Sequence, residues 1–448
     1  MCRTENFGRF LLVFATILVV ALAGTVNASE DATEQLANDA AAEINPEDIY
    51  PSAKTCSACH PKQYAERSVS QHAYTQMSPV YMAFQMAVNA LTSSTNGDFC
   101  IRCHNPIGMN MEESLFISNL ERPASSREGI TCSVCHRISQ NYGKVSGRLS
   151  LVQGPMHSKI FGPSGGDELD RVIADPAEEG FRVVTNPLER GAIVHAEVHK
   201  FEPLTSSAFC GTCHDVTLFN GFRLEEAFSE YRMSPAAARG TTCQDCHMGK
   251  QQGVESGYEI GPAAIVGGVP TESRKLANHF FAGPDYSIIS PGIFPHNSEA
   301  QQIATLEQWL QFDHVAGWGT DEFEDEVEYD HVFPERWDAI DDRYDARAIL
   351  EDQFELLEWA REKRHEVLRN GYQIDKIETV SADQSGIEFK IKVINASDGH
   401  NVPTGFSGER LVWLDVTVSD AKGTVIFRSG DRDPNGDLRD GHSSYVHA

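Results

Sequence analysis

The apolar and polar positions of the chain follow three patterns in turn. An unbroken apolar run extends from Phe10 to about Val26. From about Pro51 to Asn370, apolar residues recur mostly at helical spacing, in short stretches separated by turn residues. From about Tyr372, apolar and polar residues alternate with the period of a β-strand. We therefore expect an N-terminal targeting segment, a mainly α region with long loops, and a small C-terminal β module.

The apolar run at the N-terminus has the features of a signal peptide. Arg3 and Arg9 precede or flank it, and Val-Asn-Ala-Ser follows, which predicts residues 1–28 as a signal cleaved after Ala28. Because the run is near the lower limit for a spanning helix, an uncleaved membrane anchor is the alternative. Residues 29–50 are acidic and Ala-rich without an apolar period, which indicates a linker. Either way, the rest of the chain is expected in the periplasm or outside the cell.

Three stretches of the central region have helical periods. Residues 79–92 are apolar on most of the helix circumference, with Pro79 at the start, and predict a buried helix. Residues 300–312 and 345–370 predict two more, the second closed by Gly371 as a C-terminal cap. A dense acidic run, residues 321–330, lies between them and is typical of a solvated loop, with cation or partner binding as the alternative. Residues 292–371 therefore form a helical segment with an acidic loop.

The C-terminal stretch, residues 372–448, predicts a small β-sandwich-like module. Ile387, Phe389, Ile391 and Val393 alternate with charged residues, and further apolar positions follow in 412–418 and 425–427. These amount to about four strands, whereas such a module usually has about seven. The module is therefore incomplete, or another chain supplies the missing edge.

The motif Cys-x-x-Cys-His occurs five times between residues 51 and 291. Its spacing places two thiols and an imidazole on one short turn, where the thiols can bond to a porphyrin edge and the imidazole can bind the iron. The eleventh cysteine, Cys2, lies in the expected signal peptide. The motif cysteines are Cys56, Cys59, Cys100, Cys103, Cys132, Cys135, Cys210, Cys213, Cys243 and Cys246, and the motif histidines are His60, His104, His136, His214 and His247.

These motifs predict five covalently bound haem c groups. Zinc sites built from pairs of motifs are an alternative, but zinc does not require a histidine directly after every cysteine pair, and disulfides would leave the histidines unexplained. The motifs lie too close in sequence for each haem to have its own core. The haems should therefore share packing and lie near enough for electron hopping, so that residues 51–291 form one pentahaem region, mainly α with long loops around the haems.

The sixth ligand of each iron decides what such a protein does. A second histidine gives a low-spin haem suited to electron transfer, whereas an open position admits a substrate. Outside the motifs, His195 lies one helical turn from His199 and could replace it, and His296 could replace His400. The candidates for distal ligands are His72, His199, His279, His157 and His400.

The net charge of the chain limits the classes of partner that it can bind. Its formal net charge is −28, which excludes nucleic acid as a partner and disfavours anionic lipid surfaces. Such a surface suits basic redox partner proteins, or it serves solubility alone. A homo-oligomer joined through the β module is a further alternative.

Several stretches carry more than the bare motif. They are Cys56-Ser-Ala-Cys59-His60-Pro-Lys-Gln-Tyr64 with Ser-x-His72-Ala, Glu128-Gly-Ile-Thr-Cys132-Ser-Val-Cys135-His136, Phe209-Cys210-Gly-Thr-Cys213-His214, and Gly240-Thr-Thr-Cys243-Gln-Asp-Cys246-His247 with the later Asn278-His279-Phe280. Over roughly residues 52 to 285 they resemble the multihaem cytochromes of the cytochrome c-552/4 family, which is related to pentahaem nitrite reductases and octahaem hydroxylamine oxidoreductases. The resemblance implies haems stacked in pairs, mostly with two histidine ligands, in respiratory electron transfer. The segment from Gly399 to Gly405 resembles part of a β module attached to such cytochromes.

The chain also departs from the enzymes of that superfamily. Nitrite reductases usually bind the catalytic iron through the lysine of a Cys-x-x-Cys-Lys motif, which this sequence lacks. Nor can a tyrosine be assigned to a haem cross-link. The sequence therefore favours an electron carrier over an enzyme. The alternative is a multihaem oxidoreductase that acts on a small nitrogen or sulfur compound at one open haem, since some relatives with five histidine-type motifs keep one.

Overall fold

The computed structural model describes residues 49–140, 146–174, 182–285 and 298–439. The expected signal peptide and most of the linker lie outside these residues. Backbone contacts divide the described chain into two units, which are residues 49–140, 148–204, 257–285 and 298–364, and residues 146–147, 205–256 and 365–439. None of the described helices has both the length and the apolar character needed to cross a membrane.

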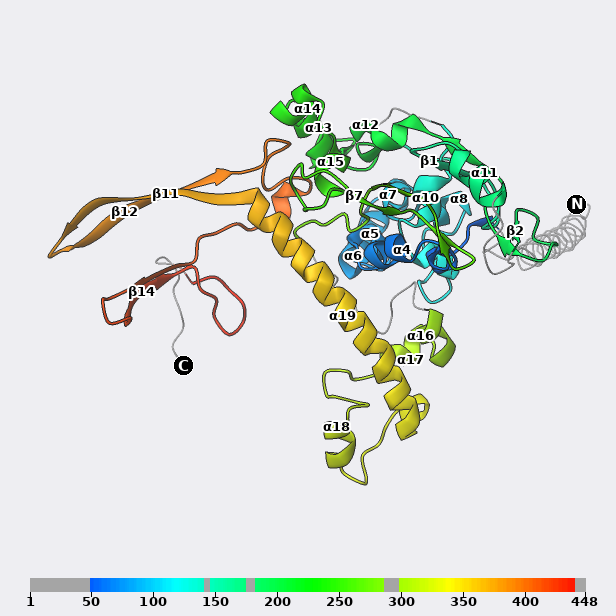
Figure 1. Cartoon of the computed structure of the whole chain (residues 1–448). Coiled ribbons are helices and arrows are strands. Elements are labelled where there is room, and N and C mark those ends of the chain that lie inside the picture. Colours follow the sequence, from blue (N-terminus) through cyan, green and yellow to red (C-terminus); the bar gives the residue numbers. More distant parts are fainter. Residues whose placement is uncertain (1–48, 141–145, 175–181, 286–297, 440–448) are drawn as a thin grey trace, which may run out of the picture. The chain divides into compact units, whose positions relative to one another are not determined.

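Short helices build the first part of the first unit (Figure 1). Several begin at prolines, which fit the first helical turn, where an amide hydrogen has no partner inside the helix. Side chains also cap two of these helices: the Ser78 hydroxyl accepts from the Tyr81 amide, and the Asn105 side chain accepts from the Gly108 amide. The helices are α3 (Ala53–Ser57), α4 (Pro61–Ser68), α5 (Gln71–Tyr74), α6 (Pro79–Leu91), α7 (Ile101–His104), α8 (Pro106–Asn110), α9 (Ala124–Arg127) and α10 (Cys132–His136).

Helix α6 corrects one expectation. The helix forms, but its buried residues are the polar stripe Tyr81, Gln85 and Asn89. Apolar residues such as Phe84 and Leu91 are exposed instead. An apolar period shows that a helix is favourable, but it does not tell which side the neighbouring elements will cover.

Small two-stranded sheets lie between the helices, where the sequence predicted loops. In the first unit, β1 (Ile160–Gly162) pairs in parallel with β4 (Val198–Lys200), and β2 (Val183–Val184) in parallel with β3 (Ala192–Ile193). Antiparallel pairs join β7 (Glu259–Pro262) to β10 (Ser273–Leu276), and β8 (Ile265–Val266) to β9 (Val269–Pro270). Helix α11 (Asp167–Ala174) and the 3-10 turn η1 (Glu202–Thr205) complete this stretch.

An aromatic core fills the helical segment of the first unit. Trp309, Phe312 and Trp337 pack with ring centroids 4.9 to 5.8 Å apart, and Trp318 adds a further edge-to-face contact. The surrounding elements are α16 (Ser298–Ile303), α17 (Leu306–Trp309), α18 (Asp321–Glu326), η3 (Glu335–Trp337) and α19 (Ile340–Gly371). Figure 1 shows α19 as one uninterrupted helix, longer at its start than the predicted 345–370.

The acidic run, residues 321–330, is not simply a solvated loop. Residues 321–326 form helix α18, whose N-cap Thr320 accepts from the Phe323 amide. Glu324 is buried against Arg343 of α19, whose Nε donates to Glu324 Oε1 at 2.8 Å. Burial raises the pKa of this carboxyl, but the hydrogen bonds from Arg343 and Gly319 outweigh burial and lower the pKa overall. The run therefore also anchors this segment.

The second unit contains short helices, one short strand pair and, after helix α19, two separate β-ribbons (Figure 1). Its elements before α19 are α12 (Ser207–Cys210), β5 (Val216–Thr217) paired with β6 (Arg223–Glu225), α13 (Ala227–Arg232), α14 (Pro235–Arg239) and α15 (Cys243–His247). Then β11 (Tyr372–Asp383) pairs antiparallel with β12 (Gly386–Asn395), and after η4 (Ser407–Glu409), β13 (Val416–Ser419) pairs with β14 (Val425–Ser429). Among the described residues the two ribbons form separate sheets, so the β-sandwich stays a prediction.

Candidate functional site

Each Cys-x-x-Cys-His motif folds as one tight helical turn. In the first, second and fourth motifs, the histidine amide donates to the carbonyl of the first cysteine, at 2.8, 3.2 and 2.9 Å. The third and fifth motifs are helices α10 and α15. All ten motif cysteines are partly buried and form no disulfide. This geometry brings two thiols and one imidazole to the same turn, as covalent haem attachment requires.

Three motif histidines have their Nδ1 atoms engaged. His60 Nδ1 donates to the Ala263 carbonyl at 2.7 Å, and His136 Nδ1 donates to the Phe161 carbonyl at 2.8 Å. His214 Nδ1 lies 3.2 Å from the Glu225 carboxylate. A hydrogen bond of this kind fixes the ring and the tautomer, and leaves Nε2 able to bind a metal.

Two motif histidines each face a histidine from elsewhere in the same unit. The rings of His60 and His195 have centroids 6.4 Å apart and planes that differ by 16°. The rings of His247 and His400 have centroids 6.1 Å apart and planes that differ by 10°. The outer histidines are also oriented, because His195 Nδ1 donates to the Met156 carbonyl at 2.9 Å and His400 Nδ1 to the Asn401 carbonyl at 2.7 Å.

His195 is suited to the neutral state that a metal ligand needs. Burial lowers its pKa to about 4, although the hydrogen bond to Met156 acts in the opposite direction. His199, which the sequence favoured over His195, is half exposed in strand β4, and its Nε2 lies 2.6 Å from Glu197. The two residues do not lie on one helical turn, because residues 194–197 lead into β4. The geometry therefore favours His195.

The other predicted distal histidines lie in different surroundings. His279 is partly buried, and desolvation, followed by the nearby His136, lowers its pKa to about 3. Its ring and that of His72 both contact Phe281, with centroids 5.8 and 4.5 Å away. His157 is half-buried, and its carbonyl accepts from the Ala196 amide. His296, the substitute for His400, lies outside the described residues.

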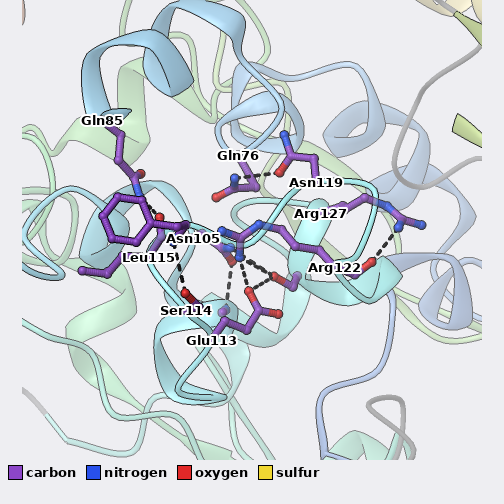
Figure 2. Close-up of polar contacts among 12 residues, drawn as sticks. Gln76, Gln85, Asn105, Glu113, Ser114, Leu115, Asn119, Arg122 and Arg127 are labelled. Carbon is purple, nitrogen blue, oxygen red and sulfur yellow. Dashed lines mark hydrogen bonds and ion pairs between the residues drawn. The ribbon is translucent and has the colours of Figure 1, made fainter. Parts of the chain in front are cut away.

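The second motif rests on a buried polar network that sequence analysis missed. Tyr81 stacks on His104 with centroids 4.1 Å apart and planes 6° apart. Directly after the motif, the Asn105 side chain donates to the Ser126 hydroxyl at 3.1 Å, and that hydroxyl donates to Glu113 at 2.7 Å. Figure 2 shows Arg122 reaching the same carboxylate as an ion pair. No sequence pattern identifies this network, because its members come from different turns of the chain.

Contacts between cysteines relate the motifs to one another. Cys56 and Cys132, the first cysteines of the first and third motifs, share a hydrogen bond, which raises the pKa of Cys56 and lowers that of Cys132. Cys210 and Cys243, the first cysteines of the fourth and fifth motifs, also share a hydrogen bond. This bond lowers the pKa of Cys243 to about 7. In the part of the chain that the structure describes, no group of three or more His, Cys, Asp or Glu side chains could hold a metal ion.

Part of the chain matches a model of a known protein family. Residues 55–137, which include the first three motifs, match the family described as cytochrome c554 and c-prime. Neither the curated proteins nor the solved structures contain a match to this chain. The family match supports a c-type cytochrome with covalently bound haem c that carries electrons.

Proposed function

We propose that this chain is a pentahaem cytochrome that carries electrons outside the cytoplasm, with irons held mostly between two histidines. The family match covers the first three motifs. The fourth and fifth motifs have the same sequence pattern and the same turn geometry, which supports extending the assignment to five haems. The N-terminal sequence supports export, because haem c is attached outside the cytoplasm and the expected signal precedes all five motifs.

The opposed histidine pairs carry this proposal. With an iron–nitrogen bond of about 2 Å and a ring centre about 1.1 Å behind the nitrogen, two imidazoles on one iron would have centres about 6.2 Å apart. The centroid distances of 6.4 Å for His60 and His195 and 6.1 Å for His247 and His400 fit that spacing. The first and fifth haems would therefore have two histidine ligands.

The chain's own groups would tune these haems. When bound, haem iron supplies the one-electron exchange between its ferric and ferrous states. The carbonyls of Ala263 and Met156 accept from the Nδ1 atoms of His60 and His195, hold the two rings in position and raise their basicity. Burial around His195 excludes water and favours neutral imidazole, the form that binds iron.

The contacts between motifs support electron transfer from haem to haem. Because Cys56 and Cys132 are in hydrogen-bond contact, the first and third haems would be attached at adjoining points. The contact between Cys210 and Cys243 relates the fourth and fifth haems in the same way. These would be the two closely coupled pairs of the pentahaem region, one in each unit.

Ligand variants test the proposal by spectroscopy of the loaded protein. His195→Ala and His400→Ala should each convert one haem in five from low-spin to high-spin, as seen by electron paramagnetic resonance, and make it bind carbon monoxide. His199→Ala is the matched control and should change neither signal, because the ring is half exposed and turned to Glu197.

Two results would contradict the proposal. One is an unchanged spin state in both variants, which would reject the assigned ligands. The other is a haem in the unaltered protein that already binds carbon monoxide and reduces a small nitrogen or sulfur compound with turnover. That result would favour the oxidoreductase over the carrier.

A further inference from the structure

Two buried charged residues join the first motif to the third. Arg67 lies on helix α4, which directly follows the first motif, and Glu128 lies four residues before Cys132, where the third motif begins. The two residues are 3% and 0% exposed. Water and salt screen such deeply buried charges only weakly, so their field acts on any group that is bound beside them.

The positive charge is held beside the third motif. Arg67 Nε and Nη2 donate to the Ile130 carbonyl at 3.0 and 2.9 Å, and Nη2 also donates to the Glu128 carbonyl. Ile130 lies two residues before Cys132. Arg67 Nη1 is buried and has no hydrogen-bond partner among the described residues. The carbonyls that the guanidinium contacts have no net charge, so these contacts leave its positive charge uncompensated.

The negative charge is held beside the first motif. Glu128 Oε2 accepts from the Ala53 amide at 2.8 Å, and Oε1 accepts from the Ser52 hydroxyl. Ala53 begins helix α3, which contains Cys56 of the first motif. Each charged side chain therefore reaches from the segment of one motif to the backbone of the other, and the two charges lie in a fixed order across the junction between the motifs.

The cysteines at this junction respond to the two charges in the same order. The hydrogen bond with Cys132 and burial raise the pKa of Cys56, and there the charge of Glu128 has a larger effect than that of Arg67. The hydrogen bond with Cys56 lowers the pKa of Cys132 against the effect of burial, and there the charge of Arg67 has the larger effect. In the loaded protein both sulfurs would be thioethers on the porphyrin edges, so the two haems would experience the same charges in the same order.

We propose that Arg67 and Glu128 hold the third haem at a higher reduction potential than the first. A reduced haem has one positive charge less than an oxidised one, so a nearby cation favours reduction and a nearby anion opposes it. The third haem would therefore accept an electron before the first.

This inference rests on one part of the proposed function, which is haem attachment at the first and third motifs. Both motifs lie within residues 55–137, the part of the chain that the family model matches. The inference does not depend on the number of haems, on their distal ligands or on the redox partner.

A redox titration of the loaded full chain, with each haem assigned by proton NMR, tests the proposal. Arg67→Met should lower the potential of the third haem, and Glu128→Gln should raise that of the first. Each shift should amount to at least a tenfold change in the reduction equilibrium, which is about 59 mV for one electron. A merely structural role would not produce opposite shifts, because looser packing would admit water to both haems in either variant.

Two control variants separate the effect of charge from that of structure. Arg67→Lys keeps a positive charge and should keep most of the difference between the two potentials. Arg361→Met removes a cation from an exposed ion pair of the same unit and should change neither potential. The shifts in Arg67→Met and Glu128→Gln should persist at high salt, because the charges that they remove are buried.

Mass spectrometry of the haem peptides distinguishes failure of this inference from failure of the proposed function. Absence of haem from the first or third motif of the unaltered protein would contradict the proposed function and the inference together. Potentials that stay unchanged, or that shift in the same direction in both variants of a fully loaded protein, would overturn the inference alone. If Arg67→Met did not fold or retain its haems, Glu128→Gln would decide the matter: a rise in the potential of the first haem supports the inference, and no rise overturns it.

Discussion

At the scale of single residues, the ion pair between Arg122 and Glu113 stabilises the region after the second motif. Both side chains are almost completely buried, and the Ser126 hydroxyl also donates to Glu113. Removing one member of such a pair leaves a buried charge without compensation, which costs about 3–5 kcal/mol. Arg122→Met should therefore lower the free energy of unfolding by about 3–5 kcal/mol, measured by denaturant titration of the loaded protein.

An exposed ion pair provides the control for this prediction. Arg361 and Glu358 are both about half exposed on helix α19, so Arg361→Met should cost at most about 1 kcal/mol. Replacing Arg122 and Glu113 together by apolar residues should cost less than Arg122→Met alone, because no charge is then left buried. Equal losses in the free energy of unfolding for Arg122→Met and Arg361→Met would show that the buried ion pair stabilises the fold no more than an exposed one.

The carboxyl of Glu324 should make stability depend on acidity. Its pKa is lowered in the folded protein by Arg343 and the Gly319 amide, so its contribution is present above the pKa of the unfolded chain. That contribution is lost as pH falls through the lowered folded value. Glu324→Gln should thus be less stable than the unaltered protein at neutral pH, and the two should converge in acid. Unfolding titrations at several pH values would measure this, and a constant difference at all pH values would contradict it.

At the scale of elements, one glycine sets how closely helix α19 approaches the loop before α18. Gly319 has a φ of +76°, and a Cβ there would lie 2.1 Å from the Arg343 carbonyl oxygen. Gly257 has a similar φ of +69°, but a Cβ there would meet nothing within 4 Å. Gly319→Ala should therefore destabilise the protein more than Gly257→Ala, which incurs only about 1–2 kcal/mol of left-handed strain. Thermal unfolding of both variants would check this, and similar losses would reject the close approach.

What could be predicted from the sequence depends on the range of the interaction. The Cys-x-x-Cys-His turns are local, since their hydrogen bonds join residues of one motif, and helix α19 and strand β12 follow from their own periods. The histidine whose ring faces His60 is His195, and no sequence period relates two positions that lie so far apart in the chain. The side of α6 that becomes buried was misjudged for the same reason, because Tyr81 and Gln85 are held by residues outside the helix.

The strands of the C-terminal region show the same limit. The alternation of Ile387, Phe389, Ile391 and Val393 predicted β12, and Ile377 and Ile391 are paired across the ribbon on one face. Val412 and Leu414 share that alternation, but strand β13 begins only at Val416. Alternation indicates which residues can share a face, and pairing with a second strand decides which of them form a strand.

At the scale of the whole molecule, net charge should govern how the proposed carrier meets its redox partners. A surface with a net charge of −28 attracts a basic protein from a distance and repels an acidic one. Salt screens both effects, with a Debye length of about 10 Å at 0.1 M. The rate of reduction by a basic carrier protein should therefore fall by a factor of about 10 to 10³ as salt rises, and the rate with an acidic carrier should rise.

Stopped-flow reduction of the loaded protein would measure these rates, with a small uncharged reductant as the control whose rate should not change with salt. If the reaction with the basic carrier were insensitive to salt, the acidic surface would serve solubility alone.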